Sequence, residues 1–85
     1  MNDIIVKLQK DGAYYKFNGI VECVRSQTKN ETVIAELKKM KSDNAQIAGY
    51  SISDFSLAAL DVLNVEKYTG NNENVLRIIQ SRFDF

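Results

Sequence analysis

Two dipeptides that favour tight turns lie close together near the start of this 85-residue chain. Asp11-Gly12 and Asn18-Gly19 both tolerate the positive φ angles of a two-residue type I′ turn, and strand-forming residues flank each of them. With Asp11-Gly12 as a loop, the two flanking strands pair in a register that puts apolar side chains on one face. Those side chains are Val6, Leu8, Tyr15 and Phe17. The start of the chain is therefore predicted to form a β-hairpin.

Residues 20–25 follow the second turn signal directly, and both of their alternating faces are mixed. As a strand, this segment pairs with the strand before Asn18 and completes a three-stranded meander. As a helix, it begins just after Gly19. The sequence leaves both alternatives open, so we expect an antiparallel meander of two or three strands.

The spacing of apolar residues changes to that of a helix after Thr28. Residues 28–31 have the spacing of a capping box, and Asn30 is an alternative N-cap. The apolar positions that follow at helical spacing are Val33, Ile34, Leu37 and Met40. This helix either continues to Ala48, with Gly49 as its stop, or breaks at residues 42–44.

A second helix is predicted from Ser51, where Ser51 and Asp54 have the spacing of another capping box. Residues 55–63 are apolar on nearly all sides, so this helix must be covered on several sides. We expect it to be the centre of the domain, or to be covered in part by a second subunit. A third helix is capped by Asn72, and its inward residues are Val75, Leu76, Ile79 and Phe83.

These elements predict one α+β domain over residues 1–85, with an N-terminal antiparallel β-meander followed by three packed helices. A domain of this size has a thin core, and the chain has no cysteine pair for a disulfide and no cysteine cluster for zinc. Dimer formation is a simple way to enlarge such a core. We therefore expect a homodimer.

The chain contains no histidine and a single cysteine, Cys23, so the usual general base and the commonest metal ligand are absent from the sequence. Without a histidine to activate it, Cys23 is expected to be a structural thiol. Asp54 and Asp61 fall where a helix cap and a solvent-facing position account for them. The sequence predicts no enzyme activity, no catalytic residue, no metal site and no cofactor.

Basic and acidic residues balance at eleven each, so bulk charge gives no reason to favour nucleic acid or an anionic membrane. One local arrangement favours nucleic acid. On the outer face of the expected meander an aromatic side chain lies among cations, as in sheets that stack bases. The residues of this candidate binding surface are Lys7, Tyr14, Lys16 and Arg25.

The best-supported function from sequence is a non-catalytic protein-interaction module that regulates or inhibits a larger partner. A nucleic-acid-binding accessory protein is the alternative. The apolar run Ile4–Val6 is too short for a signal peptide, and one unpaired cysteine fits a reducing compartment, so we expect a cytoplasmic protein. Small size and eight asparagines suggest an accessory protein of a phage or mobile element.

Overall fold

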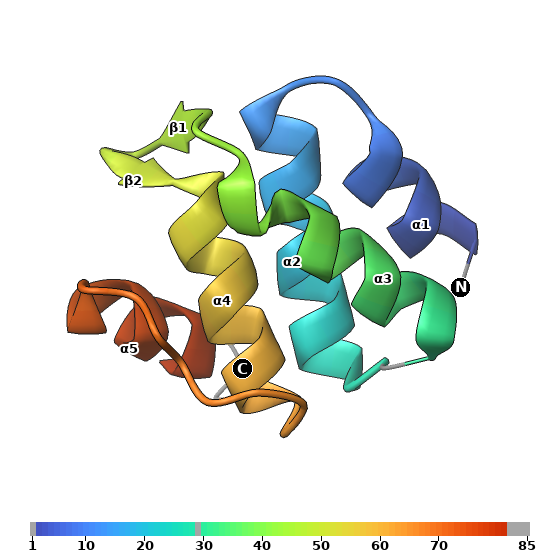
Figure 1. The fold of residues 1–85 in the computed structure, drawn as a ribbon. Helices are drawn as coiled ribbons and strands as arrows, with labels where there is room; N and C mark the ends of the chain where they lie inside the picture. Colours follow the sequence, from blue (N-terminus) through green and yellow to red (C-terminus); the bar gives the residue numbers. More distant parts are fainter. Residues whose placement is uncertain (1, 29, 82–85) are drawn as a thin grey trace.

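The computed structural model describes residues 2–28 and 30–81, and most of them are helical (Figure 1). The helices are α1 (Asn2–Gln9), α2 (Ala13–Ser26), α3 (Glu31–Lys39), α4 (Ile52–Val62) and α5 (Glu73–Ser81). A short 3-10 turn, η1 (Met40–Ser42), follows α3, and a hairpin of β1 (Gln46–Ile47) and β2 (Tyr50–Ser51) precedes α4. The fold is a helical bundle with one small hairpin.

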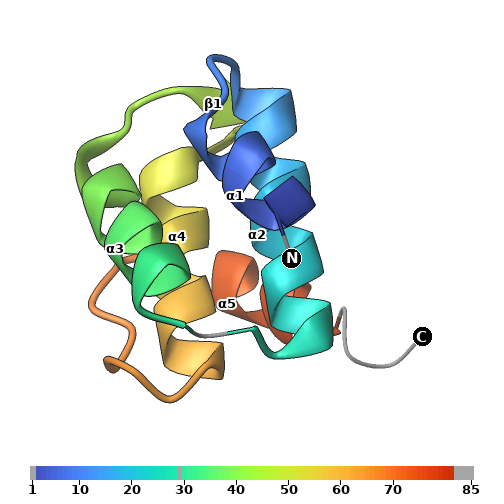
Figure 2. The ribbon, with the colours of Figure 1, turned by 90° about the vertical axis from the view of Figure 1, so that its right-hand side faces the viewer.

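The predicted N-terminal meander is wrong, because α1 and α2 form two antiparallel helices in its place (Figures 1 and 2). The supposed apolar strand face is divided: Leu8 is 1% exposed, whereas Val6 is 54% and Tyr15 is 44% exposed. Apolar residues at helical spacing make up the buried stripes instead. These are Ile4 and Leu8 on α1 and Ile20, Cys23 and Val24 on α2. Residues 20–25 are helical, as in the second alternative, but their helix begins at Ala13 and not after Gly19.

The two turn signals have different structural roles. Asp11-Gly12 does turn the chain, with Gly12 at φ 117°, but it joins two helices. Gly19 lies inside α2, where a Cβ atom would be 3.0 Å from Leu8 Cδ2 and 3.1 Å from the Leu8 backbone nitrogen. Glycine at this position lets α1 and α2 approach closely, so here it does not mark a loop.

The first predicted helix does not continue to Ala48. Asn30 is its N-cap, and the Asn30 side chain accepts a hydrogen bond of 2.9 Å from the Val33 N–H. Asp43 is extended after η1, so the helical segment ends at residues 42–44, as the second alternative predicts. Ala48 and Gly49, at φ 54° and 86°, then form the tight turn between β1 and β2. Gly49 is thus a hairpin residue and not a helix stop.

The second predicted helix, α4, is the central element of the fold. Ser51 caps it by accepting a hydrogen bond of 3.1 Å from the Asp54 N–H, as the sequence indicated. Helices α2, α3 and α5 all pack against α4 (Figure 2). Its apolar surface is therefore covered within one chain, so this surface no longer gives a reason to expect a dimer.

The last helix, α5, buries Val75 and Ile79 as predicted and lies on the side of α4 away from α1 (Figure 1). Phe83 lies outside the described residues. Within those residues, no helix is both long enough and apolar enough to cross a membrane.

Candidate binding surface

The four residues of the predicted surface do not share one face in the structure. Lys7 lies on α1, and Tyr14, Lys16 and Arg25 lie on α2. Tyr14 and Lys16 are two positions apart on a helix, so their side chains leave it about 200° apart. Arg25 shares the side of Tyr14, but about 16.5 Å further along the helix axis.

Both lysines of that surface are paired with carboxylates of the same chain. Lys7 Nζ lies 2.7 Å from Glu22 Oε1, and Lys16 Nζ lies 2.7 Å from Asp43 Oδ2. The Lys16 hydrogen bond, together with the Ala45 N–H, holds the pKa of Asp43 below its ordinary value. These ammonium groups are therefore less available to phosphates than the sequence suggested.

Two adjacent tyrosines at the start of α2 are the most exposed aromatic side chains among residues 2–28 and 30–81. Tyr14 is 65% and Tyr15 is 44% exposed, and their ring centroids lie 5.9 Å apart in an edge-to-face arrangement. The Lys10 ammonium lies 4.5 Å from the Tyr15 ring centroid. We refer to Tyr14 and Tyr15 as the tyrosine pair.

The sequence predicts Tyr14 on the exposed surface but puts Tyr15 on the buried side of a strand. A signal for both was present. When residues 13–26 are drawn as a helix, the apolar stripe falls on Ile20, Cys23 and Val24. Tyr14 and Tyr15 both project away from that stripe, so a helical interpretation would have predicted that both are exposed.

Cys23 is fully buried in α2, and its Sγ donates a hydrogen bond of 3.1 Å to the Ile20 carbonyl oxygen. Burial raises the pKa of the Cys23 thiol from 9.0 to about 12. The thiolate form is the nucleophile, so a thiol in this state does not react at neutral pH.

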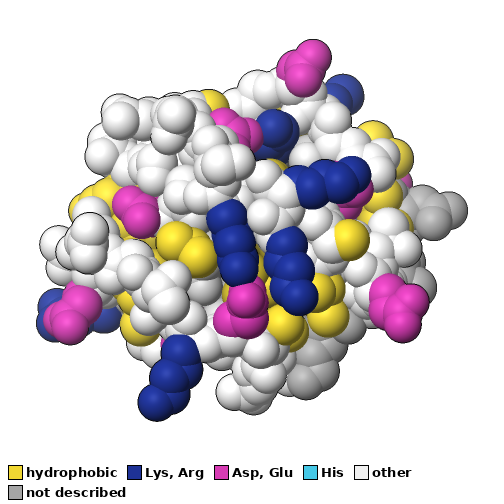
Figure 3. Space-filling model, viewed as in Figure 1, with side chains coloured by type: hydrophobic (Ala, Val, Ile, Leu, Met, Phe, Trp, Pro, Cys, Tyr) yellow, Lys and Arg dark blue, Asp and Glu magenta, His cyan; other side chains and the backbone are white. Residues whose placement is uncertain are grey.

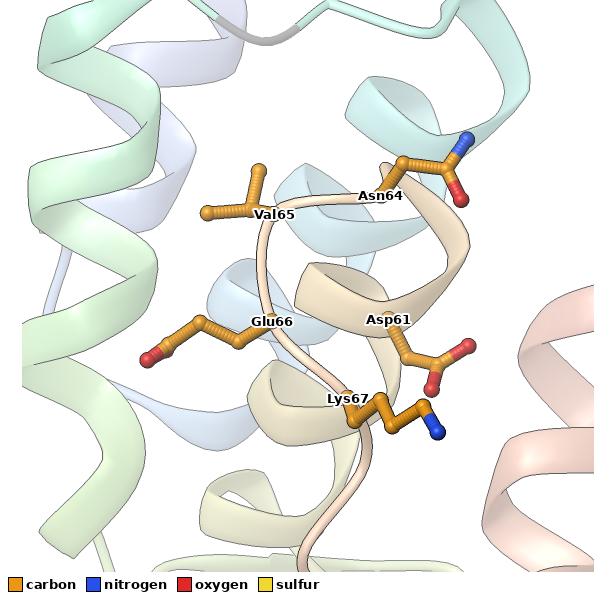
Figure 4. Close-up of a pocket in the computed structure, with 5 residues that line it drawn as sticks. All are labelled: Asp61, Asn64, Val65, Glu66 and Lys67. Atoms are coloured by element: carbon orange, nitrogen blue, oxygen red, sulfur yellow. The ribbon is translucent and has the colours of Figure 1, made fainter.

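Asp61 lines a surface hollow of about 390 Å³ next to the loop that follows α4 (Figure 4). Its Oδ2 accepts a hydrogen bond of 2.8 Å from the Tyr68 N–H. Glu66 lines the same hollow, but its side chain points to the opposite side of the loop from Asp61 (Figure 4). Glu66 pairs with Lys41 at 2.6 Å, which lowers the pKa of Glu66. The two carboxylates therefore do not converge on a common point.

Charges of both signs are interspersed on the face that carries α3 (Figure 3). The ion pair of Lys41 with Glu66 joins η1, the turn that follows α3, to the loop after α4, and Lys39 Nζ lies 3.2 Å from Oε2 of Glu36, one turn earlier on α3. In the part of the chain that the structure describes, no group of three or more histidine, cysteine or acidic residues could hold a metal ion.

Comparison of this chain with protein-family models, with curated proteins and with solved structures finds no match in any of the three.

Proposed function

We propose that this chain is a small non-catalytic protein-binding domain that regulates or inhibits a larger partner by covering part of the partner's surface. The observation that carries the proposal is the tyrosine pair, two adjacent aromatic side chains that are 65% and 44% exposed. We propose that Tyr14, Tyr15, Lys10 and the neighbouring helix α1 form the contact surface.

Tyrosine is well suited to this role. It buries a large apolar ring while its hydroxyl remains able to form a hydrogen bond, and it has few rotatable bonds to immobilise. Tyrosines are therefore enriched among the residues that dominate binding energy at protein interfaces. The contact between Lys10 and the Tyr15 ring restrains that ring before a partner arrives, which lowers the entropic cost of binding.

The groups most able to do chemistry have structural roles, which supports a non-catalytic function. The Cys23 thiol is buried with a raised pKa. Asp61 accepts the Tyr68 N–H, and Asp43 accepts hydrogen bonds from both Lys16 and Ala45. A chain of this kind acts on a partner by occupying a surface.

Two further parts of the proposal follow from the same features. A cytoplasmic location fits a single unpaired thiol, and a second copy of this chain is one protein that the tyrosine pair can bind. Nucleic-acid binding has weaker support, because Lys7 and Lys16 are already paired with carboxylates.

Affinity capture from the source cells tests the proposal. The tagged chain is compared with a Tyr14→Ala, Tyr15→Ala double variant and with a Thr32→Ala variant, which changes an exposed position on α3. We expect a protein that survives nuclease treatment and is lost only in the double variant. Capture that nuclease abolishes, or that the double variant keeps, would contradict the proposal, once circular dichroism shows that each variant is folded.

A further inference from the structure

We propose that α5 is a latch, a helix that detaches from α4 as a unit while α1 to α4 remain folded. This inference concerns a different part of the molecule from the tyrosine pair and stands independently of the proposed function. It depends on how α5 is held, on how well it is packed and on where the chain before it is anchored.

The length of α5 makes it dependent on docking. It contains 9 residues, and isolated helices shorter than roughly 12 residues are marginal in water. Two of its side chains, Val75 and Ile79, are fully buried, and Leu76 and Ile78 are partly buried. Its helical conformation therefore depends on this one apolar stripe.

The contacts of α5 are local, whereas other elements are joined across the fold. It packs chiefly against α4. Among the residues that the structure describes, the hydrogen bonds of α5 outside the helical ladder run to Asn72, which accepts from the Asn74 and Val75 N–H groups, or stay within α5. By contrast, ion pairs join α1 to α2 through Lys7 and η1 to the loop after α4 through Lys41.

The side of α5 that faces the loop before it is open to solvent. An open surface hollow of about 390 Å³ lies there, and Tyr68, Leu76 and Gln80 are among its lining residues. The buried side chains Val75 and Ile79 lie on the part of α5 that packs against α4. The docking of α5 therefore depends chiefly on that one contact.

The chain just before α5 is anchored, so residues 68–72 can stay in place while α5 detaches. The Tyr68 N–H donates to Asp61, and the Tyr68 hydroxyl forms hydrogen bonds of 2.9 and 3.0 Å with the Asn72 backbone. A side chain at Gly70 would clash with that same hydroxyl. Residues 68–72 thus form a fixed end, and release of α5 uncovers the side of α4 that Val75 and Ile79 cover.

Hydrogen exchange of the full chain, followed by mass spectrometry, tests the latch. Each amide's exchange rate is divided by its rate in the unfolded chain. If α5 opens by itself, this ratio is at least about tenfold higher for residues 76–81 than for α2 and α4. Low concentrations of urea should accelerate that α5 exchange less steeply than exchange in α2 and α4, because detachment of α5 exposes less surface than global unfolding. Equal protection and equal urea dependence in all three helices would overturn the proposal.

Two matched variants separate local from global opening. Val75 in α5 and Val33 in α3 are both valines that are 0% exposed. Val75→Ala destabilises the docked state relative to every state in which α5 has left α4, so it should accelerate exchange in α5, α2 and α4 alike by about tenfold. Val33→Ala should accelerate exchange in α2 and α4 and leave exchange in α5 unchanged, because α5 exchanges through its own opening. The latch is also supported if the amides of α5 lose all protection from exchange in Val75→Ala while the amides of α2 and α4 remain protected. Equal effects of both variants on all helices, or global unfolding of Val75→Ala, would overturn it.

Discussion

Gly19 in α2 lies directly against Leu8 in α1, so closely that a methyl group on Gly19 would come within 3.0 Å of Leu8 Cδ2. The Leu8 backbone nitrogen, at 3.1 Å from the same point, cannot move aside without moving α1. This contact fixes the separation of the first two helices, and those helices carry the tyrosine pair.

Gly19→Ala should therefore destabilise the protein. In an unhindered helix this change would stabilise by about 1 kcal/mol, because alanine is the better helix former. Here we expect a loss of about 1–2 kcal/mol in the free energy of unfolding, because the methyl group overpacks the α1–α2 contact. Urea unfolding measures the sign. Asn18→Ala, one position earlier, is the control and should be neutral or mildly stabilising; a stabilising Gly19→Ala would contradict the close contact.

Ala48 offers a change in the opposite direction. It is exposed at the hairpin tip with φ 54°, a conformation that costs alanine about 1 kcal/mol. Asparagine tolerates this region, and Asn-Gly is the preferred type I′ turn, so Ala48→Asn should stabilise by about 0.5–1 kcal/mol. Thermal unfolding measures the shift. The same change at exposed Ala35 in α3 should lower Tm, and a lower Tm for Ala48→Asn would argue against the turn.

Cys23 should be a silent thiol in the native protein. Because its pKa rises from 9.0 to about 12, we expect no reaction with a thiol reagent at pH 8 until urea unfolds the chain. The pKa of this thiol is higher in the folded chain than in the unfolded chain. The stabilisation that comes from keeping the thiol protonated is therefore fully present below pH 9, and it is lost as the pH rises towards 12. Rapid labelling without denaturant would show that α2 is not buried as described.

The pair of Lys16 with Asp43 should make stability sensitive to acid. The pKa of Asp43 is lowered from 3.8, so its stabilising contribution is present above that value and is lost as the pH falls through the folded pKa. Asp43→Asn should cost up to about 1 kcal/mol at pH 7 and little at pH 2, measured by urea unfolding. The control, Ser42→Ala, changes an exposed neighbour that carries no charge and should show no such dependence. An Asp43→Asn deficit that is equal at both pH values would contradict the ion pair.

The parts of the fold that sequence predicted correctly depend on local chemistry. Asn30 and Ser51 cap α3 and α4 through their own side chains, and residues 55–63, apolar on nearly all sides, required a central position. Those signals lie within a few residues of the structure that they specify.

The N-terminal error has a physical cause. Leu8 is buried in either a strand or a helix, so it could not distinguish the two patterns, and Gly19 serves a tertiary contact that a local turn signal cannot reveal. The candidate surface changed with the fold. Tyr14 remained exposed and Tyr15 joined it, whereas Lys16 turned out to pair with Asp43.

Site-specific photo-crosslinking tests the central claim, that the tyrosine pair binds a protein. A photoreactive phenylalanine analogue replaces Tyr14 in one chain and Gln80, an exposed residue of α5, in the control chain. Irradiation in extracts of the source cells should give a discrete protein adduct from position 14 and none from position 80. Adducts that nuclease removes, or the same adducts from both positions, would contradict the claim.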